Sequence, residues 1–457
     1  MKMKKSILIG VLMLNYASLI AQDGVLRQMP LSMDRGFLNP SLQPKHTWGI
    51  GFSVFENLVG LPISLDDISN NSVDGVVNIY DVYNSLYNKN IYVRNRASVA
   101  PLKFFMSKDD FSVFASISVK HTSKIDLNNI SEIIDGNRLF IGKYMTIDEV
   151  YIQEYSRIEI SFGAGLKLNE KLRIGANIKY LEALNYTELS TNRVGVLTDK
   201  DTYQVKFYAE NDIATLSTSG YDTSGGDTGL YFDKYLPHLY DPTKTSPGFA
   251  ADIGLSYDID KNLNISTSLN NIGLIFWTKY SSVHVLDKDL FNDKSLTEIL
   301  SSLEKDPNKI TNDFLSSVEK KDIMPKMLDI DYNISASYIL NNRHTFSLST
   351  TLYEVNRIFD YRIQGAYDFR LYKWLDLIAA PSFYKNDFEL GAGFVVGWGP
   401  VQINMATHDL VDLILINQAR SATLFLGINF MFNPDKKKSC NCEKKIVKPN
   451  KFSDKNE

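Results

Sequence analysis

The chain has 457 residues but only two cysteines, Cys440 and Cys442, both within its last 18 residues. This scarcity excludes a disulfide framework and a multi-cysteine metal site. Beyond the N-terminus the chain also lacks the run of about 20 nearly uninterrupted apolar residues that a membrane-spanning helix needs. Intrinsic disorder is excluded by what is abundant, because 25 Tyr, 25 Phe and 4 Trp supply more aromatic surface than a solvated chain carries.

Residues 1–21 have the composition of a secretory signal peptide. Three lysines among the first five residues precede a short apolar run at 7–14, and small residues lead to a polar stretch after Ala21. A positive region, an apolar run of this length and a small-residue cleavage site indicate export, whereas a membrane anchor would need a longer run. Removal of 1–21 changes the net charge from −4 to −7. The mature chain is therefore expected to work outside the cytoplasm.

Residues 47–432 alternate apolar and polar side chains in many segments. In 111–120, one face carries Phe111, Val113, Ala115, Ile117 and Val119, and the other is mostly serine and ends in lysine. The same period of two recurs at 159–168, 172–179 and in several later segments. Because successive side chains of a strand point to opposite faces, each segment is predicted to be a strand with one apolar face.

The connections between these segments differ in length from one end of the strands to the other. Short polar connections, typical of hairpins, occur at 107–110, 169–171, 258–262 and 340–344. Much longer connections lie near 56–90, 127–149, 190–247 and 287–325. Short turns at one end and long loops at the other are typical of outer-membrane barrels.

The face opposite the apolar one carries charged side chains that suit a watery lumen. A soluble sandwich or propeller, the alternative fold, would have to bury its apolar faces against a second sheet. Barrel closure also removes the strand edges that an open sheet exposes. We therefore predict an all-β, transmembrane antiparallel barrel in the lipid of the outer membrane of a Gram-negative bacterium. The candidate lumen-facing residues are Glu159, Lys167, Arg173, Lys179, Asp252, Arg362 and Arg370.

The number of strands depends on segment 201–220. If the last strand runs towards the periplasm and directions alternate strictly, this segment is either an extracellular hairpin or one extra pair of strands. The first reading predicts 14 strands and the second 16. We prefer 14, because 203–209 lacks a clean lipid-facing stripe.

The loops and the tail have their own signatures. A capping-box pattern at Ser295–Glu298 predicts a helix over 295–303, and 311–320 reads as a second short helix. Residues 433–457 contain eight lysines and four acids without periodicity, which indicates a disordered basic tail in the periplasm. This tail is a candidate docking segment for a periplasmic protein.

No residue pattern points to catalysis or to a cofactor. The six histidines lie in no recognised nucleophile or zinc motif, although His121 and His284 fall near loop-side strand ends where a hydrolase could hold a site. We therefore expect no enzyme activity, no catalytic or metal residues and no cofactor. Between 22 and 432 the chain has 38 basic and 49 acidic residues, and this acidic balance argues against nucleic-acid binding.

Two segments resemble a known group of barrels. Arg35–Leu42, with Asn39, Pro40 and Ser41, resembles the Asn-Pro-Ala element of barrels related to the FadL-type fatty-acid transporters, with serine where alanine is usual. Gly248–Trp277 is similar to part of an uncharacterised Bacteroidota family of this kind, whose members are expected to be 14-stranded barrels. Related families include transporters of hydrophobic compounds and barrels of the type nine secretion system.

The resemblance implies that 22–46 forms a hatch inside a barrel of residues 47–432. The sequence of this segment agrees, because its apolar residues do not alternate as in a strand and so need burial outside the wall. Two functions remain open. The chain either passes a small hydrophobic molecule past the hatch, or it is a non-transporting scaffold or secretion accessory that binds partners through loops and tail.

Overall fold

A computed structural model of the chain describes part of its length. The residues described are 2–4, 23–29, 32–44, 47–59, 72–73, 76–78, 91–108, 110–127, 141–142, 144–147, 150–209, 211–219, 246–278, 281–288, 318–320, 323–341, 343–355, 358–384, 387–415, 419 and 421–432. Most of the expected signal peptide, the helix expected at 295–303 and the tail 433–457 lie outside these residues.

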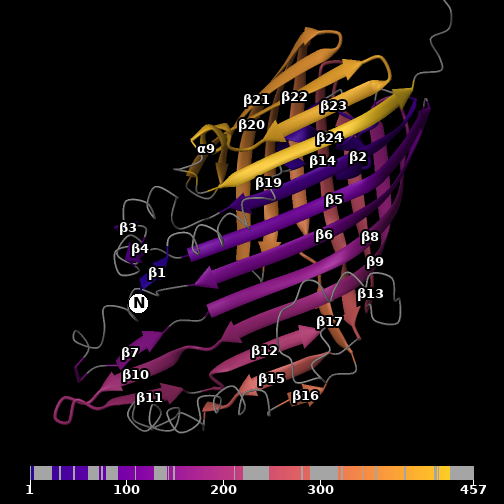
Figure 1. The fold of residues 1–457 in the computed structure, drawn as a ribbon. Coiled ribbons are helices and arrows are strands. Elements are labelled where there is room, and N and C mark those ends of the chain that lie inside the picture. Colours follow the sequence, from indigo (N-terminus) through magenta and orange to yellow (C-terminus); the bar gives the residue numbers. More distant parts are fainter. Residues whose placement is uncertain are drawn as a thin grey trace, which may run out of the picture.

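Strands that alternate apolar and polar residues close into a 14-stranded antiparallel barrel (Figure 1). Each strand pairs with its neighbour along the chain, and the last pairs with the first. This confirms the prediction of 14 strands. The strands are β2 (Trp48–Val59), β5 (Ile91–Lys108), β6 (Phe111–Leu127), β8 (Val150–Lys167), β9 (Leu172–Thr191), β13 (Ser246–Asp258), β14 (Leu263–Trp277), β18 (Asp331–Asn341), β19 (His344–Val355), β20 (Ile358–Tyr372), β21 (Leu375–Tyr384), β22 (Asp387–Trp398), β23 (Val401–Thr407) and β24 (Ala422–Phe432).

Shorter strands extend the long-loop end of the barrel. A separate sheet of β7 (Tyr144–Ile147), β10 (Val194–Thr198) and β11 (Val205–Ala209) projects beyond the wall (Figure 1). Here β12 (Ala214–Ser219) pairs with β9 and with β15 (Ser282–Leu286), and β17 (Met324–Met327) pairs with β14. Segment 201–220 is therefore neither an extra barrel pair nor one hairpin. Its two strands belong to different sheets, because β10 and β9 offer free edges on either side of it.

The helix expected over 311–320 is wrong at its end. Val318–Lys320 form strand β16, which pairs with β15 from Ser282 to His284. The free edge of β15 supplies backbone partners, so sheet pairing prevails over the weak local helical pattern. The remaining residues of that expected helix lie outside the described part of the chain.

The other described elements are small. Strands β1 (Lys2–Lys4), β4 (Val76–Asn78) and β3 (Ser72–Val73) form a minor sheet, and α9 (Leu410–Ile414) lies between β23 and β24. Helices α2 (Asp23–Arg27) and α3 (Arg35–Leu38) precede the first barrel strand. Among the described residues, no helix combines the length and apolar composition needed to cross a membrane.

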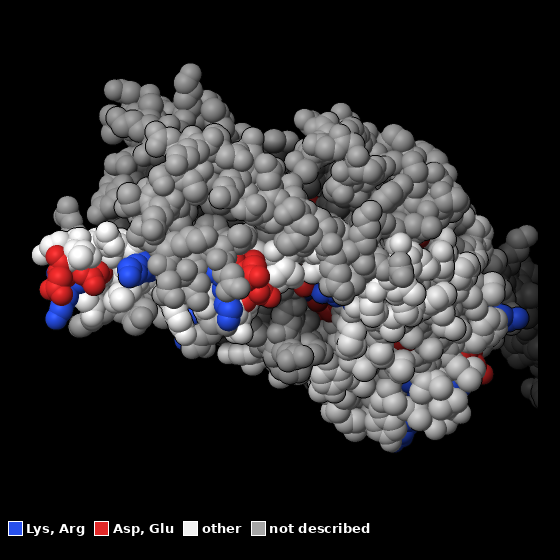
Figure 2. Space-filling view, turned by 90° about the horizontal axis from the view of Figure 1, so that it is seen from below, with Lys and Arg blue, Asp and Glu red and all other residues white. Residues whose placement is uncertain are grey.

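The barrel wall is apolar outside and polar inside. Along β13, buried and exposed side chains alternate almost strictly, and the exposed set includes Phe249 and Ile253. On neighbouring strands Phe162 is 64% and Ile178 69% exposed, although both are large and apolar. In Figure 2 an almost uncharged stretch of wall separates charged groups at the two ends of the molecule. A closed barrel with an outward apolar band belongs in lipid, and the chain is an outer-membrane barrel.

A pair of neighbouring substitutions tests the sidedness of the wall. Ile117 is 39% exposed on the outer face, whereas Ser116 lines an internal cavity. Ile117→Arg is expected to reduce assembly, because charge near the bilayer midplane costs about 2–4 kcal/mol. Ser116→Arg is expected to assemble far better, as measured by heat-modifiable electrophoretic mobility. Equal loss of folded barrel in both variants would contradict the assignment of faces.

Cysteine labelling tests the orientation of the barrel. The side chain of Glu170, in the short turn between β8 and β9, is 94% exposed, and Asp201 is exposed in the turn between β10 and β11. In a background with Cys440 and Cys442 replaced by serine, a membrane-impermeant maleimide on intact cells should label Asp201→Cys and not Glu170→Cys. Lysed cells, in which both sites should react, serve as the control. The reverse pattern would invert the orientation.

Candidate functional site in the barrel lumen

The segment from residue 23 to 44, called the hatch segment below, lies inside the barrel. Val25, Leu26 and Met29 are at most 1% exposed and pack against wall residues that include Ala380 and Val395. Met33 lies in a second cluster with Phe105 and Phe114, and Phe37 meets Phe114 edge-on. These apolar side chains find their burial in the lumen, which is why they need no strand alternation.

Polar groups of the hatch segment bind opposite parts of the wall. Arg27 donates to the Ser268 hydroxyl at 3.0 Å on β14, and Gln28 donates to Ser349 at 2.6 Å on β19. On the far side, the Met33 backbone N–H donates to Gln402 at 3.3 Å on β23. The segment therefore bridges the lumen rather than following one strand.

The strongest single anchor is a buried ion pair between Asp34 and Lys103 of β5. The side chains of both residues are at most 6% exposed. Asp34 also accepts a 2.7 Å hydrogen bond from Asn404, which donates to Ser32 as well at 3.0 Å. Removing one partner of such a pair would leave an uncompensated buried charge, which costs several kcal/mol.

The Asn39-Pro40-Ser41 element forms a compact turn against the wall. The Asn39 side-chain oxygen accepts from the Ser41 backbone N–H at 3.1 Å and from its hydroxyl at 2.7 Å. The Asn39 amide donates to the Thr267 carbonyl at 3.3 Å on β14. Serine at position 41, where the resemblance would place alanine, thus adds a hydrogen bond within the turn.

Glycines on three adjacent strands make room for this turn. A Cβ at Gly175 would lie 2.3 Å from the Pro40 carbonyl, one at Gly165 would lie 2.5 Å from the same oxygen, and one at Gly254 would lie 2.1 Å from Asn39. No real Cβ contact is that short, so the backbone of the turn sits directly on the bare inner wall.

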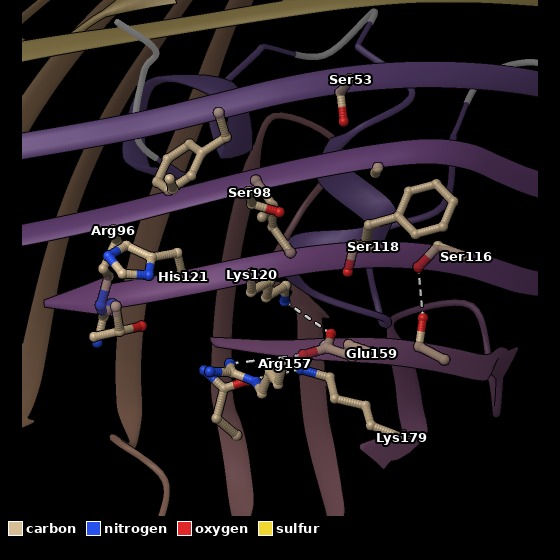
Figure 3. A pocket seen from close by; sticks show the side chains of 18 of the residues that line it. Ser53, Arg96, Ser98, Ser116, Ser118, Lys120, His121, Arg157, Glu159 and Lys179 are labelled. Atoms are coloured by element: carbon tan, nitrogen blue, oxygen red, sulfur yellow. Dashed lines mark hydrogen bonds and ion pairs between the residues drawn. The ribbon is translucent and has the colours of Figure 1, made fainter. Parts of the chain in front are cut away.

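A cavity of about 180 Å³ lies between the hatch segment and the wall (Figure 3). Leu26, Phe37 and Leu38 of the hatch segment give it an apolar side. Charged side chains of the wall face it from other directions, including Lys120 of β6, and Arg157 and Glu159 of β8. The cavity therefore combines an apolar surface with a concentration of buried charge.

One charge cluster centres on Glu159. Lys120 donates to Glu159 at 2.8 Å, Lys179 lies 3.6 Å from the same oxygen, and Arg157 lies 3.7 Å from the other (Figure 3). Lys179 also pairs with Asp252 at 2.7 Å. Residues three strands apart thus share two carboxylates.

A second cluster surrounds Asp329, between β17 and β18. Its carboxylate lies 2.5 Å from Lys124, 3.4 Å from Arg94 and 3.5 Å from Arg96. Arg96 also pairs with Asp331 at 3.0 Å. Both clusters border the cavity through Arg96, Asp329 and Asp331.

The structure brings together three of the residues expected to face the lumen, namely Glu159, Lys179 and Asp252. The others lie elsewhere, each with its own partner. Arg362 pairs with Glu389 at 2.9 Å, Arg370 with Asp376 at 3.0 Å, Lys167 with Glu170 at 3.0 Å near the short-turn rim, and Arg173 donates to Gln43 of the hatch segment.

The sequence reasoning missed Lys120, Lys124 and Arg157. Lys120 and Lys124 share the strand parity of Ser118, and Arg157 shares that of Glu159, so the same alternation could have found them. Asp329 could not be found this way, because it lies outside a strand and enters the site through the tertiary fold.

The two candidate histidines show no catalytic relay. His121 Nδ1 lies 3.0 Å from the Ser156 hydroxyl, but its Nε2 is 4.0 Å from Glu154, beyond hydrogen-bond reach. His284 Nε2 lies 3.0 Å from the Ser282 hydroxyl. Within the described residues, no three His, Cys, Asp or Glu side chains are grouped to hold a metal ion. The absence of enzyme activity stays a prediction.

A comparison with protein families matches residues 40–408 to a family of unknown function, DUF5723. The chain belongs to this family. No curated protein matches it. The DUF5723 chain is similar to solved barrels at low identity, and the likeness concerns shape alone.

Three of these solved barrels illustrate the range. A deletion mutant of the monoaromatic hydrocarbon channel TodX shares 10% identity, with 90% of this chain and 99% of that one covered and a TM-score of 0.45. The Ralstonia pickettii toluene transporter TbuX shares 9%, covering 91% and 100%, with a TM-score of 0.42. A Pseudomonas aeruginosa FadL homologue shares 9%, covering 90% and 96%, with a TM-score of 0.42. Such scores carry no inference about this protein's activity.

A methyl group at Gly175 tests how the hatch segment is seated. Gly175→Ala would press on the Pro40 carbonyl, and overpacking of this kind costs about 1–3 kcal/mol. The variant is expected to form a barrel that leaks a small neutral sugar faster than wild type in a liposome-swelling assay. Gly365→Ala is the matched control, because nothing lies within 4 Å of its added Cβ. Equal leak from all three proteins would contradict this seating.

Proposed function

We propose that the protein is a gated channel of the outer membrane, in which the hatch segment closes the lumen to small solutes. The observation that carries this proposal is the position of residues 23–44, which cross the lumen and bind walls on opposite sides. A segment that served only to fill space would need apolar packing alone. This one is also held by polar contacts that can exchange with water, and a gate requires such reversible contacts.

The latch of the proposed gate is the Asp34–Lys103 ion pair with its Asn404 hydrogen bond. If water enters the lumen when the hatch segment moves, both charges become solvated and the cost of separating them falls. Opening and hydration of the lumen are then one coupled event. The cavity beside the segment is the first space that a solute would reach on that path.

The chemistry of the solute follows from the cavity lining. The resemblance implied a small hydrophobic molecule, and Leu26, Phe37 and Leu38 offer it a matching surface. The charged wall opposite favours a solute that also carries a polar group, because an entirely apolar body would desolvate those charges without replacing their hydrogen bonds. We propose passive transport of small amphiphilic solutes.

A scaffold or secretion accessory is the second candidate. It is favoured by the sheet β7–β10–β11, which projects beyond the wall at the long-loop end and offers its outer strand edges to a partner. A periplasmic partner for residues 433–457 belongs to the same proposal. The contacts across the lumen favour the channel, because a scaffold needs no hatch.

Deletion of residues 23–36 distinguishes the two candidates. The deletion removes Asp34 and the apolar plug but spares Asn39, Pro40 and strand β2, so the wall should still close. A channel should then leak small solutes several-fold faster than wild type in liposome swelling, because the lumen loses its cross-bridges.

Deletion of 433–457 is the matched control, since it leaves the lumen contacts untouched. A scaffold would show unchanged permeability after the first deletion and the loss of a periplasmic partner after the second. A stable barrel with wild-type permeability after deletion of 23–36 would end the channel proposal.

A further inference from the structure

Arg157 is a buried cation whose hydrogen bonding is incomplete. It is 5% exposed and lines the cavity, yet Nε and Nη1 of its guanidinium have no hydrogen-bond partner among the described residues. Its one ion pair, to Glu159, is 3.7 Å long, beyond hydrogen-bond distance. By contrast Arg362, equally buried, binds Glu389 at 2.9 Å. Buried guanidinium donors are normally satisfied, so these two nitrogens call for an acceptor.

The strand register places a second cation beside Arg157. Lys120 of β6 lies directly opposite Arg157 of β8, and both side chains face the lumen. Like charges at directly opposed positions destabilise a sheet unless something negative lies between them. Glu159 supplies part of that charge, but it is shared with Lys179 as well.

The charges near Glu159 leave a cationic excess. Lys120, Arg157 and Lys179 face two carboxylates, those of Glu159 and Asp252. One further negative charge would balance the cluster. An oxyanion can accept from the planar guanidinium in a way that a neutral hydroxyl cannot match, because charge-assisted hydrogen bonds are roughly twice as strong.

The remaining wall of the cavity describes the body of the ligand. Leu26, Phe37 and Leu38 line one side, and the hydroxyls of Ser116 and Ser118 line another (Figure 3). A volume of about 180 Å³ suits a molecule with one ring or a short chain, since an apolar cavity of about 150 Å³ binds benzene. Long acyl chains exceed it.

We propose that this cavity is a binding site for a small organic acid, with the carboxylate on Arg157 beside Lys120 and the apolar body against the hatch segment. The inference rests on the proposed function in taking the cavity as a station on the solute's path. It adds the chemical class of the solute. Binding itself needs no flux, so the two statements can fail separately.

Calorimetric titration of the detergent-solubilised full chain tests the site, with benzoate as probe and benzyl alcohol as its neutral counterpart. Wild type should bind benzoate saturably and benzyl alcohol about tenfold more weakly or less, as expected when a charge-assisted hydrogen bond is lost. Arg157→Gln should weaken benzoate binding by about tenfold and leave benzyl alcohol unchanged. Arg362→Gln, which alters an equally buried arginine outside the cavity lining, should leave benzoate binding unchanged.

Several outcomes would overturn the site. These are no benzoate binding, equal binding of both probes by wild type, or unchanged benzoate binding in Arg157→Gln. If Arg157→Gln does not fold, Arg157→Lys keeps the charge but not the planar donor set, and should still weaken benzoate binding. Benzoate binding without faster leak after deletion of 23–36 would remove the channel and keep the site. Faster leak without benzoate binding would do the opposite.

Discussion

The structure depends on closing the sheet, because a backbone polar group left unpaired in lipid costs several kcal/mol. Closure is made where β24 pairs with β2 along almost the whole length of both, from Trp48 opposite Phe432 to Leu58 opposite Ala422. The stacked rings of Trp48 and Phe432 lie at one end of this seam. Once the seam forms, no barrel strand has a free edge within the wall, and every outward side chain meets lipid.

Closure also determines what the lumen must contain. Fourteen strands enclose more space than inward side chains of one layer fill, so the interior needs either water or a plug. The hatch segment takes up part of that space, and its apolar residues are buried there to within about 1% exposure. Its charged and polar residues match the wall, as Asp34 does with Lys103. The remaining space is a small cavity lined by charge.

Charge inside the lumen is tolerated because cross-strand neighbours compensate it. Glu159 and Asp329 each sit among three cations from adjacent or facing strands. Such networks are costly to break and so hold the wall in one arrangement. Arg157 is the member whose donors are least satisfied. A lumen built for stability alone would be expected to pair it fully, and this is why the cluster reads as a site rather than as filler.

The sequence by itself determined the barrel, because period-two alternation has one physical meaning over segments of this length. Segments such as 111–120 show which face meets lipid, and the connection lengths separate the two ends. The count of 14 followed from strand direction, since antiparallel neighbours must alternate. Local pattern failed at Val318–Lys320, where the edge of β15 offered backbone partners that no nearby residue reveals.

Only the tertiary structure decided the composition of the lumen site. Alternation places Glu159, Lys179 and Asp252 on the inner face, but it places Arg362 and Arg370 there equally, and these lie with other partners. Which inward charges meet depends on strand register and barrel circumference, and Asp329 joins from outside any strand. The seat of Pro40 on Gly165 and Gly175 likewise joins residues more than 100 positions apart. Distances across a lumen are set by closure of the whole sheet, and no local stretch of sequence carries them.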